Sequence, residues 1–161
     1  MSAATVFTLT RDDGLVISND ASRLDIDRVC AWLAASYWAN ERDRATIERS
    51  IAHSYPYGVY APGGEQVALA RITTDLASFA WIGDVVVDEA WRGKGIGTWL
   101  MRVVIDHLIE LGVPRFLLGT RDAHGVYERV GFTPLRIPAV WMELDLRANR
   151  PDPGDVSPPA R

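Results

Sequence analysis

The feature that most constrains the fold is a glycine-rich loop between an apolar strand and an apolar helix. The loop runs from Arg92 to Gly97, with glycines at alternate positions, and it follows the run Val85-Val86-Val87. Glycine lets a backbone approach a ligand closely, and the helix start that follows presents unpaired N–H groups and a positive dipole end. The segment therefore predicts a strand–loop–helix unit that binds a pyrophosphate, to which Arg92 and Lys94 add positive charge. The alternative is a tight connection without a ligand.

Strand-like and helix-like patterns alternate along the rest of the chain. Apolar alternation and short apolar runs predict strands over residues 6–10, 15–18, 57–61, 67–74, 79–87, 115–120 and 140–146. Apolar spacing of three and four residues predicts helices over 25–37, over 44–54, from the glycine-rich loop to about Leu111, and over 123–130. Gly112 and Gly131 stand where left-handed helix caps are expected. This order predicts an α/β (α+β) domain with a mixed sheet over residues 1–146 and a proline-rich, disordered tail over 147–161.

Length, charge and cysteine content exclude several classes of protein. A chain of 161 residues that is 48% hydrophobic and 24% charged has the size and composition of one globular domain. Its net charge of −4 argues against a general nucleic-acid binder, which needs a basic surface. The lone cysteine, Cys30, excludes an internal disulfide and a multi-cysteine zinc site, and no metal is expected. Without a secretory signal pattern or an apolar run of ~20 residues, the chain is expected to be soluble and cytoplasmic, with no membrane partner.

The spacing of the loop discriminates between phosphate ligands. A dinucleotide-binding fold needs G-x-G-x-x-G, but counting from Gly95 puts Leu100 at the third glycine. A P-loop needs G-x-x-x-x-G-K-[ST], and the sequence contains no such string. The loop does match [RQ]-x-x-G-x-[GA], a coenzyme A signature, at Arg92, Gly95 and Gly97. At this point the chain resembles the GNAT superfamily of N-acetyltransferases.

A second motif strengthens the resemblance. The segment 120–132 is similar to the GNAT pattern N-x-x-A-x-x-[LF]-Y-x-x-x-G-F. The residues that match are Ala123, Tyr127, Gly131 and Phe132, and Thr120 stands where asparagine is usual. Both motifs occur in the usual order, so the resemblance extends over about residues 6–146. The chain looks like a branch of small bacterial GNAT proteins of unassigned substrate that carry a Thr-Arg-Asp-Ala-His-Gly stretch.

The resemblance implies a fold and an activity. The fold would be a mixed, mostly antiparallel central sheet of about six to seven strands with about four flanking helices. A central strand pair would splay apart at the acetyl-CoA site. The activity would be transfer of the acetyl group of acetyl-CoA to a primary amine, on a small molecule or a peptide, by direct attack in a ternary complex.

The same resemblance assigns residues to this site. Tyr127 is implied to protonate the departing thiolate. The residues implied to bind coenzyme A are Val85, Val86 and Val87 through their backbone, then Arg92, Gly93, Lys94, Gly95, Ile96, Gly97 and Thr98 around the pyrophosphate, and Thr120 and His124. Since Thr120 lacks the two-sided amide of asparagine, only a hydroxyl contact to the pantetheine is left to it.

The acceptor amine must lose a proton, and the sequence leaves the identity of the base open. A free alkyl amine has a pKa near ~10.4, so a base is expected, either direct or through water. Asp84 interrupts an apolar strand, where a carboxylate is costly unless it is paired or used. It is the first candidate for the base, and a structural ion pair with Arg71 or Arg121 is the alternative. Asp75 and His124 are weaker candidates.

Other features have simpler interpretations. The resemblance implies that residues 37–42 and 55–57 shape the acceptor side. Their aromatic side chains suit a cationic or planar acceptor, but ordinary core packing with a polar helix end is favoured. Cys30 and His107 lie on apolar helix faces and are predicted to pack. The alternative functions are a coenzyme A-binding sensor without turnover, transfer of a longer acyl group, and acetylation of a protein N-terminus. Exposed edge strands are compatible with a homodimer.

Overall fold

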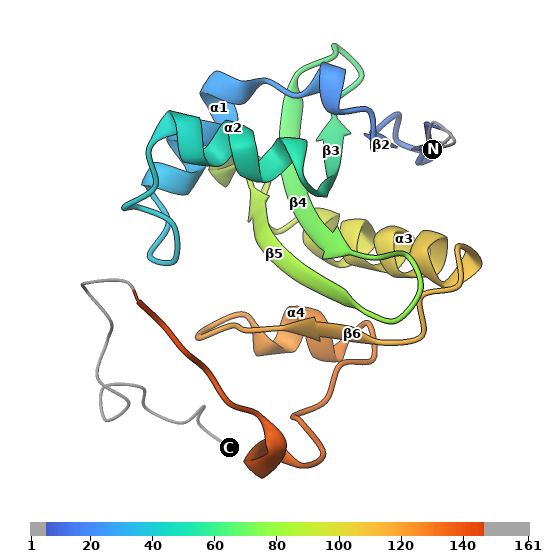
Figure 1. Cartoon of the computed structure of the whole chain (residues 1–161). Coiled ribbons are helices and arrows are strands. Elements are labelled where there is room, and N and C mark those ends of the chain that lie inside the picture. Colours follow the sequence, from blue (N-terminus) through green and yellow to red (C-terminus); the bar gives the residue numbers. More distant parts are fainter. Residues whose placement is uncertain (1–5, 147–161) are drawn as a thin grey trace. The chain divides into compact units, whose positions relative to one another are not determined.

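The chain divides into two compact units, Met1–Gly119 and Thr120–Arg161. The computed structural model describes residues 6–146, so the tail predicted over 147–161 lies outside the described residues. The first unit holds the sheet and the three longer α-helices, and the second holds one short α-helix (Figure 1).

The first unit is built on a six-stranded sheet whose strands lie side by side in sequence order. The strands are β1 (Thr8–Thr10), β2 (Val16–Ser18), β3 (Tyr55–Tyr60), β4 (Gln66–Thr74), β5 (Ala80–Val87) and β6 (Phe116–Leu118). Each of the first five is antiparallel to its neighbours within that group, whereas β6 is parallel to β5. This confirms the mixed, mostly antiparallel sheet that the resemblance implied.

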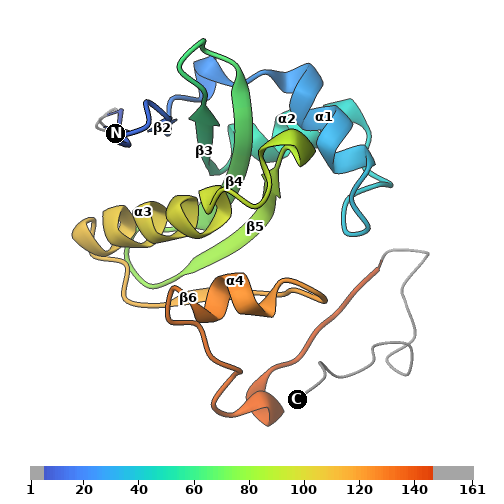
Figure 2. The ribbon, with the colours of Figure 1, turned by 180° about the vertical axis from the view of Figure 1, so that it is seen from behind.

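Helices cover both faces of this sheet. The first unit contains α1 (Ile26–Ala34), α2 (Arg44–Ala52) and α3 (Ile96–Glu110), with 3₁₀ turns at Ala21–Arg23 and Glu89–Trp91. The two opposite views agree that α1 and α2 lie on one face and α3 on the other (Figure 1, Figure 2). Asp25 and Asp43 cap α1 and α2, because their carboxylates accept hydrogen bonds from the backbone N–H groups of Arg28 and Thr46.

An apolar core joins α1 and α2 to the middle of the sheet. Its buried members are Leu24, Val29, Leu33, Ala39, Ile47, Ile51, Leu69 and Val86. Leu69 lies on β4 and Val86 on β5, so the helices pack directly on the two central strands. Burial of one such aliphatic side chain contributes ~1.5–3 kcal/mol. The core therefore holds the carboxyl-terminal half of β5 firmly in place.

A glycine ends α3, as its sequence predicts. Gly112 has a φ of +97°. Its N–H donates to the carbonyl of Ile109, and the N–H of Val113 donates to the carbonyl of Leu108, both at 2.9 Å. This pair of bonds is the Schellman motif, which needs a left-handed residue at this point.

The second unit repeats this motif after α4 (His124–Glu128). Gly131 also has a φ of +97°. Its N–H donates to the carbonyl of Glu128 at 3.0 Å, and the N–H of Phe132 donates to the carbonyl of Tyr127 at 3.1 Å. The predicted cap is therefore confirmed. A 3₁₀ turn at Pro138–Val140 follows.

Two sequence predictions are wrong, one about the end of the first helix and one about a strand near residue 146. The first helix ends at Ala34 and not at residue 37. The strand predicted over 140–146 is wrong, because residues 141–146 pair with no strand in the described part of the chain. An alternating apolar face becomes a strand only where a partner supplies the ladder and covers that face. Here Met142 and Leu144 are 98% and 84% exposed.

An aromatic cluster around the buried Tyr57 connects α3 to the start of the chain. The hydroxyl of Tyr57 and Nδ1 of His107 share a hydrogen bond of 2.8 Å. The ring of Phe7 stacks on the ring of His107 with 4.0 Å between centroids. Burial lowers the pKa of His107, against a smaller opposing effect of Glu110. This confirms that His107 is a packing residue.

The lowered pKa of His107 predicts a pH-dependent stability. Unfolding restores the ordinary pKa of 6.5, so the unfolded chain binds more protons in mildly acidic solution. The stabilising contribution of His107 to the folded state is therefore complete above pH 6.5, and it is lost as the pH falls through the lower pKa of the folded state. The measurement is the free energy of unfolding in urea at pH 7.5 and 5.5.

The variant His107→Gln should show a smaller difference between the two pH values than the wild type. The exposed histidine variant His53→Gln is the control and should keep the wild-type difference. An unchanged difference in His107→Gln would contradict this account of the cluster.

Candidate functional site

The central strands β5 and β6 separate after a short paired stretch. Only Ala80, Trp81 and Ile82 of β5 pair with β6, and β5 continues to Val87. Over Gly83–Val87 the described strands pair with one edge of β5 only, the edge that faces β4. The other edge presents backbone N–H and C=O groups, and such groups bind an extended ligand by strand-like hydrogen bonds. Val85, Val86 and Val87 lie on this unpaired edge, as predicted.

A β-bulge shapes the start of this unpaired edge. Leu69 pairs with Val86, and Arg71 pairs with Gly83. Two residues of β5, Asp84 and Val85, therefore lie opposite the single residue Ala70 of β4. Asp84 has a φ of +49°, a left-handed conformation that costs about 1–2 kcal/mol for a residue other than glycine. Bulges next to active sites re-aim a side chain, and strained residues persist where their surroundings hold them.

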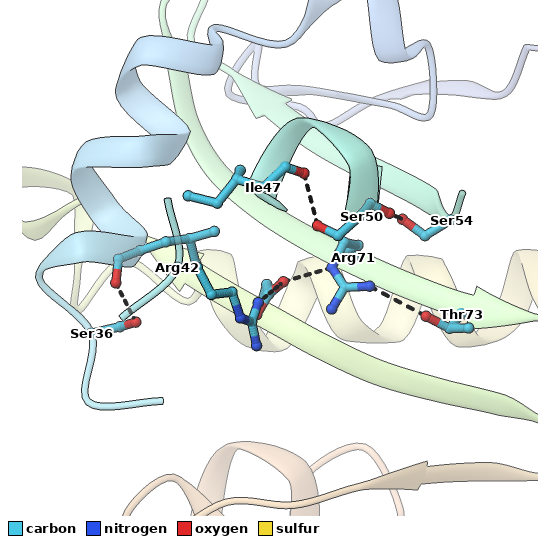
Figure 3. A network of polar contacts seen from close by, with 9 residues as sticks. Ser36, Arg42, Ile47, Ser50, Ser54, Arg71 and Thr73 are labelled. Carbon is cyan, nitrogen blue, oxygen red and sulfur yellow. Dashed lines mark hydrogen bonds and ion pairs between the residues drawn. The ribbon is translucent and has the colours of Figure 1, made fainter. Parts of the chain in front are cut away.

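Two arginines hold the side chain of Asp84. The residue is 4% exposed. Nη1 of Arg42 donates to both carboxylate oxygens at 2.9 Å, and Nε of Arg71 donates to Oδ2 at 2.6 Å. Figure 3 shows the guanidinium groups of Arg42, from the segment before α2, and of Arg71, from β4, close to each other. They compensate the buried charge, which would otherwise be very costly.

The ion pair that the sequence offered as an alternative is therefore present with Arg71. Arg42, which the resemblance placed in the acceptor-side segment, was not predicted as an ion-pair partner, because it lies between α1 and α2, 42 residues from Asp84, and no periodic pattern marks the contact. The other partner considered, Arg121, belongs to the second unit.

Asp75 serves as a turn residue. Its carboxylate accepts hydrogen bonds from the backbone N–H groups of Ala77 and Ser78 and from the hydroxyl of Ser78. These bonds, with the hydroxyl contact foremost, hold the pKa of Asp75 far below its usual range. Asp75 therefore has a structural role in the turn between β4 and β5.

The glycine-rich loop leads from β5 into the start of α3. Gly93 and Gly95 have φ of +75° and +71°, and a Cβ built on either would meet no atom within 4 Å. Gly95 is the N-cap of α3 and provides no side-chain cap. The first-turn N–H groups of this 15-residue helix therefore have no capping side chain, and such groups bind anions. The residues of that turn are Ile96, Gly97 and Thr98.

The two cations of the loop have different roles. Nε of Arg92 donates to the carbonyl of Val87 at 3.1 Å, which fastens the loop to the end of β5. Nζ of Lys94 lies 4.4 Å from the ring centroid of Trp91, a cation–π contact at an exposed position. The ammonium group of Lys94 therefore lies beside the loop, where it adds to the attraction for an anion.

The remaining predicted residues, Thr120, His124 and Tyr127, belong to the second unit. Oγ1 of Thr120 accepts a hydrogen bond from the N–H of Ala123 at 3.1 Å, which leaves its own hydroxyl proton to donate. His124 is the first residue of α4, and Tyr127 lies one turn later. The Tyr127 ring packs edge-on against Phe132 with 5.9 Å between centroids.

The aromatic segment after α1 combines packing with one unexplained polar atom. Tyr37 and Trp38 contact each other edge-to-face at 5.0 Å, and Trp38 packs against the apolar core. This supports the predicted packing role of Trp38. Its indole Nε1 is buried and has no hydrogen-bond partner in the described part of the chain. Buried polar groups of this kind are uncommon and call for an explanation.

Membrane-spanning helices and metal-binding clusters are both absent from residues 6–146. None of the helices there has the length and apolar character that crossing a membrane requires. Within the same residues, no three or more His, Cys, Asp or Glu side chains are grouped so that they could hold a metal ion.

Comparison with known proteins identifies the family. The model of the Acetyltransferase (GNAT) family matches residues 24–132. A crystal structure of a GNAT-family protein from Xanthomonas campestris pv. campestris is 40% identical, with a TM-score of 0.76 over 89% of this chain and 97% of that one. A curated Gibberella zeae protein named as an acetyltransferase is 26% identical over 62% of this chain, and the match spans 66% of its length.

A more distant structure shares the fold. N-acetylglutamate synthase from Neisseria gonorrhoeae, complexed with coenzyme A and N-acetylglutamate, is 19% identical, with a TM-score of 0.64 over 76% of this chain and 29% of that one. The family match covers both motifs and the whole of β5, the glycine-rich loop and α3. The chain belongs to the Acetyltransferase (GNAT) family.

Proposed function

We propose that the protein transfers the acetyl group of acetyl-CoA to a primary amine. The observation that carries the proposal is the continuity of two binding elements in one unit. The unpaired edge of β5 runs directly into a glycine-rich loop and the uncapped start of α3. An extended ligand with a pyrophosphate at one end suits this combination, and acetyl-CoA has that form.

Each part of acetyl-CoA has matching groups in this proposal. The amide-containing pantetheine arm forms strand-like hydrogen bonds with the backbone of Val85–Val87. The pyrophosphate binds the N–H groups of the loop and of the first turn of α3, and the charge of Lys94 adds to the attraction. The hydroxyl proton of Thr120 remains available for a further contact.

The reaction is direct attack of the amine nitrogen on the thioester carbonyl. A C–N bond forms and the C–S bond breaks, so that the products are an acetylated amine and coenzyme A. The amine loses a proton and the thiolate gains one. Holding both substrates together makes a covalent enzyme intermediate unnecessary.

In this proposal, Tyr127 is the general acid and Asp84 is the general base. Tyr127 donates to the departing thiolate, whose thiol has a pKa near ~8.5. Asp84 acts through a water molecule. Its two oxygens have about four acceptor positions, of which Arg42 and Arg71 use three, so one remains on Oδ1 for a water molecule that passes the proton of the amine on to this carboxylate.

The choice of acetyl-CoA and of an amine acceptor goes beyond the family match. The Neisseria relative holds N-acetylglutamate, whereas a structure with a TM-score of 0.60 is a glucosamine-6-phosphate N-acetyltransferase from Arabidopsis thaliana. Since one fold accommodates such different acceptors, the acceptor must be argued from the residues of this chain.

Binding of acetyl-CoA is predicted to raise the melting temperature of the protein, because a ligand that binds only the folded state stabilises it by about 2.7 kcal/mol at a hundred times its Kd. NAD should not raise it. The variant Gly95→Ala should lose most of the rise. A left-handed alanine is strained, and its Cβ would occupy open space beside the loop where the pyrophosphate is proposed to bind. The measurement is thermal unfolding with and without each ligand.

The control for this experiment is Gly64→Ala. Gly64 has a φ of +88° and open space at its Cβ, so it shares the strain of Gly95 at a turn far along the chain from the loop. It should melt lower than the wild type and still respond fully to acetyl-CoA. If saturating acetyl-CoA left the wild-type melting temperature unchanged, the donor site would be wrong.

Replacing Tyr127 by phenylalanine is predicted to lower the rate of acetyl transfer by about 10²–10⁴-fold, the usual contribution of a general acid. Coenzyme A release is measured under conditions in which the chemical step limits the rate. Tyr55→Phe, which changes another half-buried tyrosine, is the control and should keep the wild-type rate. Full turnover by Tyr127→Phe would show that the acid is another group.

A further inference from the structure

The cluster of Arg42, Asp84 and Arg71 has an excess of positive charge. Two guanidinium groups face one carboxylate, which leaves a net charge of +1. A buried carboxylate needs compensation, but one well-placed arginine supplies it. The second arginine is therefore not explained by the burial of Asp84 alone.

One edge of the Arg42 guanidinium group makes no hydrogen bond within the described residues. Only Nη1 is engaged with Asp84, and neither Nε nor Nη2 donates a hydrogen bond to any described residue. These two N–H groups are parallel and match the two oxygens of a carboxylate or a phosphate. The side chain is 29% exposed, so a ligand can reach this edge.

Arg71 offers a further donor beside it. Its Nε donates to Asp84 and its Nη1 to Oγ1 of Thr73 at 3.3 Å, so Nη2 is left without a hydrogen bond to the described residues. A Cβ built on Gly83 would stand 3.4 Å from Nη2. The glycine therefore keeps this nitrogen uncovered on the side of β5.

The location of the cluster connects it to the donor site. Asp84 precedes Val85–Val87 directly, and it stands at the bulge where β5 is already separated from β6. The strained backbone of Asp84 fixes its carboxylate toward Arg42 and Arg71 and so holds both guanidinium groups at that end of the unpaired edge. A molecule bound there lies next to the proposed path of the pantetheine arm.

We infer that the acceptor carries an anionic group, a carboxylate or a phosphate, which binds Nε and Nη2 of Arg42 together with Nη2 of Arg71. The inference rests on the proposed function, because it names the class of amine that the same site acetylates. The acceptor class is then amino acids, amino-sugar phosphates and other amines with a nearby anion.

The test compares amines that differ only in the anionic group. The probes are β-alanine against β-alaninamide, O-phosphoethanolamine against ethanolamine, and glucosamine 6-phosphate against glucosamine. For each probe, kcat/KM is measured with acetyl-CoA. The anionic member of at least one pair should be preferred by about 10- to 100-fold, the usual effect of a charge-assisted hydrogen-bonding site.

Variants of Arg42 assign this preference to the cluster. Arg42→Gln should reduce the preference to about unity, with an unchanged KM for acetyl-CoA, and Arg42→Lys should retain part of it, since the charge stays but the parallel donors are lost. Arg49→Gln is the matched control. It removes an equal charge from α2, where the exposed Arg49 side chain donates to Oγ1 of Thr46 at 3.5 Å, and it should keep the wild-type preference.

A binding experiment separates the inference from the proposed function. The melting temperature is measured with each probe in the presence of coenzyme A, which requires no turnover. If the anionic probes raise the melting temperature more than their neutral partners, and Arg42→Gln loses this difference, the inference is supported. This holds even if no amine is acetylated, and the absence of acetylation would refute the proposed function alone. Absence of any difference within all three pairs, or an equal difference in Arg42→Gln, overturns the inference.

Discussion

The separation of β5 from β6 after Ile82 is the constraint on which the rest of the structure depends. Three residues of each strand pair. Of the next five residues of β5, Gly83, Val86 and Val87 pair with β4, and none of the five pairs with a described strand on the other side. A lone strand edge inside a sheet is costly unless its polar groups find other partners. The apolar core around Leu69 and Val86 holds β5 in place from one face, so the edge stays open while the strand stays ordered.

Asp84 links this opening to the surrounding electrostatics. Its left-handed backbone makes the bulge, and its buried carboxylate binds one arginine from β4 and one from the segment between α1 and α2. The strain and the burial would each destabilise the fold alone, and the ion pairs offset them. A single residue thus couples the backbone geometry of the donor site to the charge beside it.

Much of this arrangement could be predicted from the sequence, because the relevant signals are local. The left-handed caps at Gly112 and Gly131 follow from glycine at a helix end, and the glycine-rich loop follows from glycines between a strand and a helix. The carboxylate at position 84 is conspicuous because it interrupts an apolar run. In each case a few adjacent residues determine the conformation.

The failures concern contacts that no local pattern encodes. Arg42 reaches Asp84 across 42 positions, and its role depends on how the segment after α1 folds back on β5. The alternation of Val140, Met142 and Leu144 indicated a strand, but a strand also needs a neighbour, and alternation does not supply one. The first helix stops at Ala34 although the apolar spacing continues to Tyr37, which packs against Trp38 instead.

The central claim is that the backbone of β5 and the start of α3 bind the donor. Hydrogen exchange of individual amides, with and without acetyl-CoA, tests it most directly, because it reads the proposed backbone contacts one by one. The account predicts new protection at amides within residues 83–87 and 95–98, with smaller changes in β1 and β2. Binding of acetyl-CoA without added protection in these two segments would contradict it.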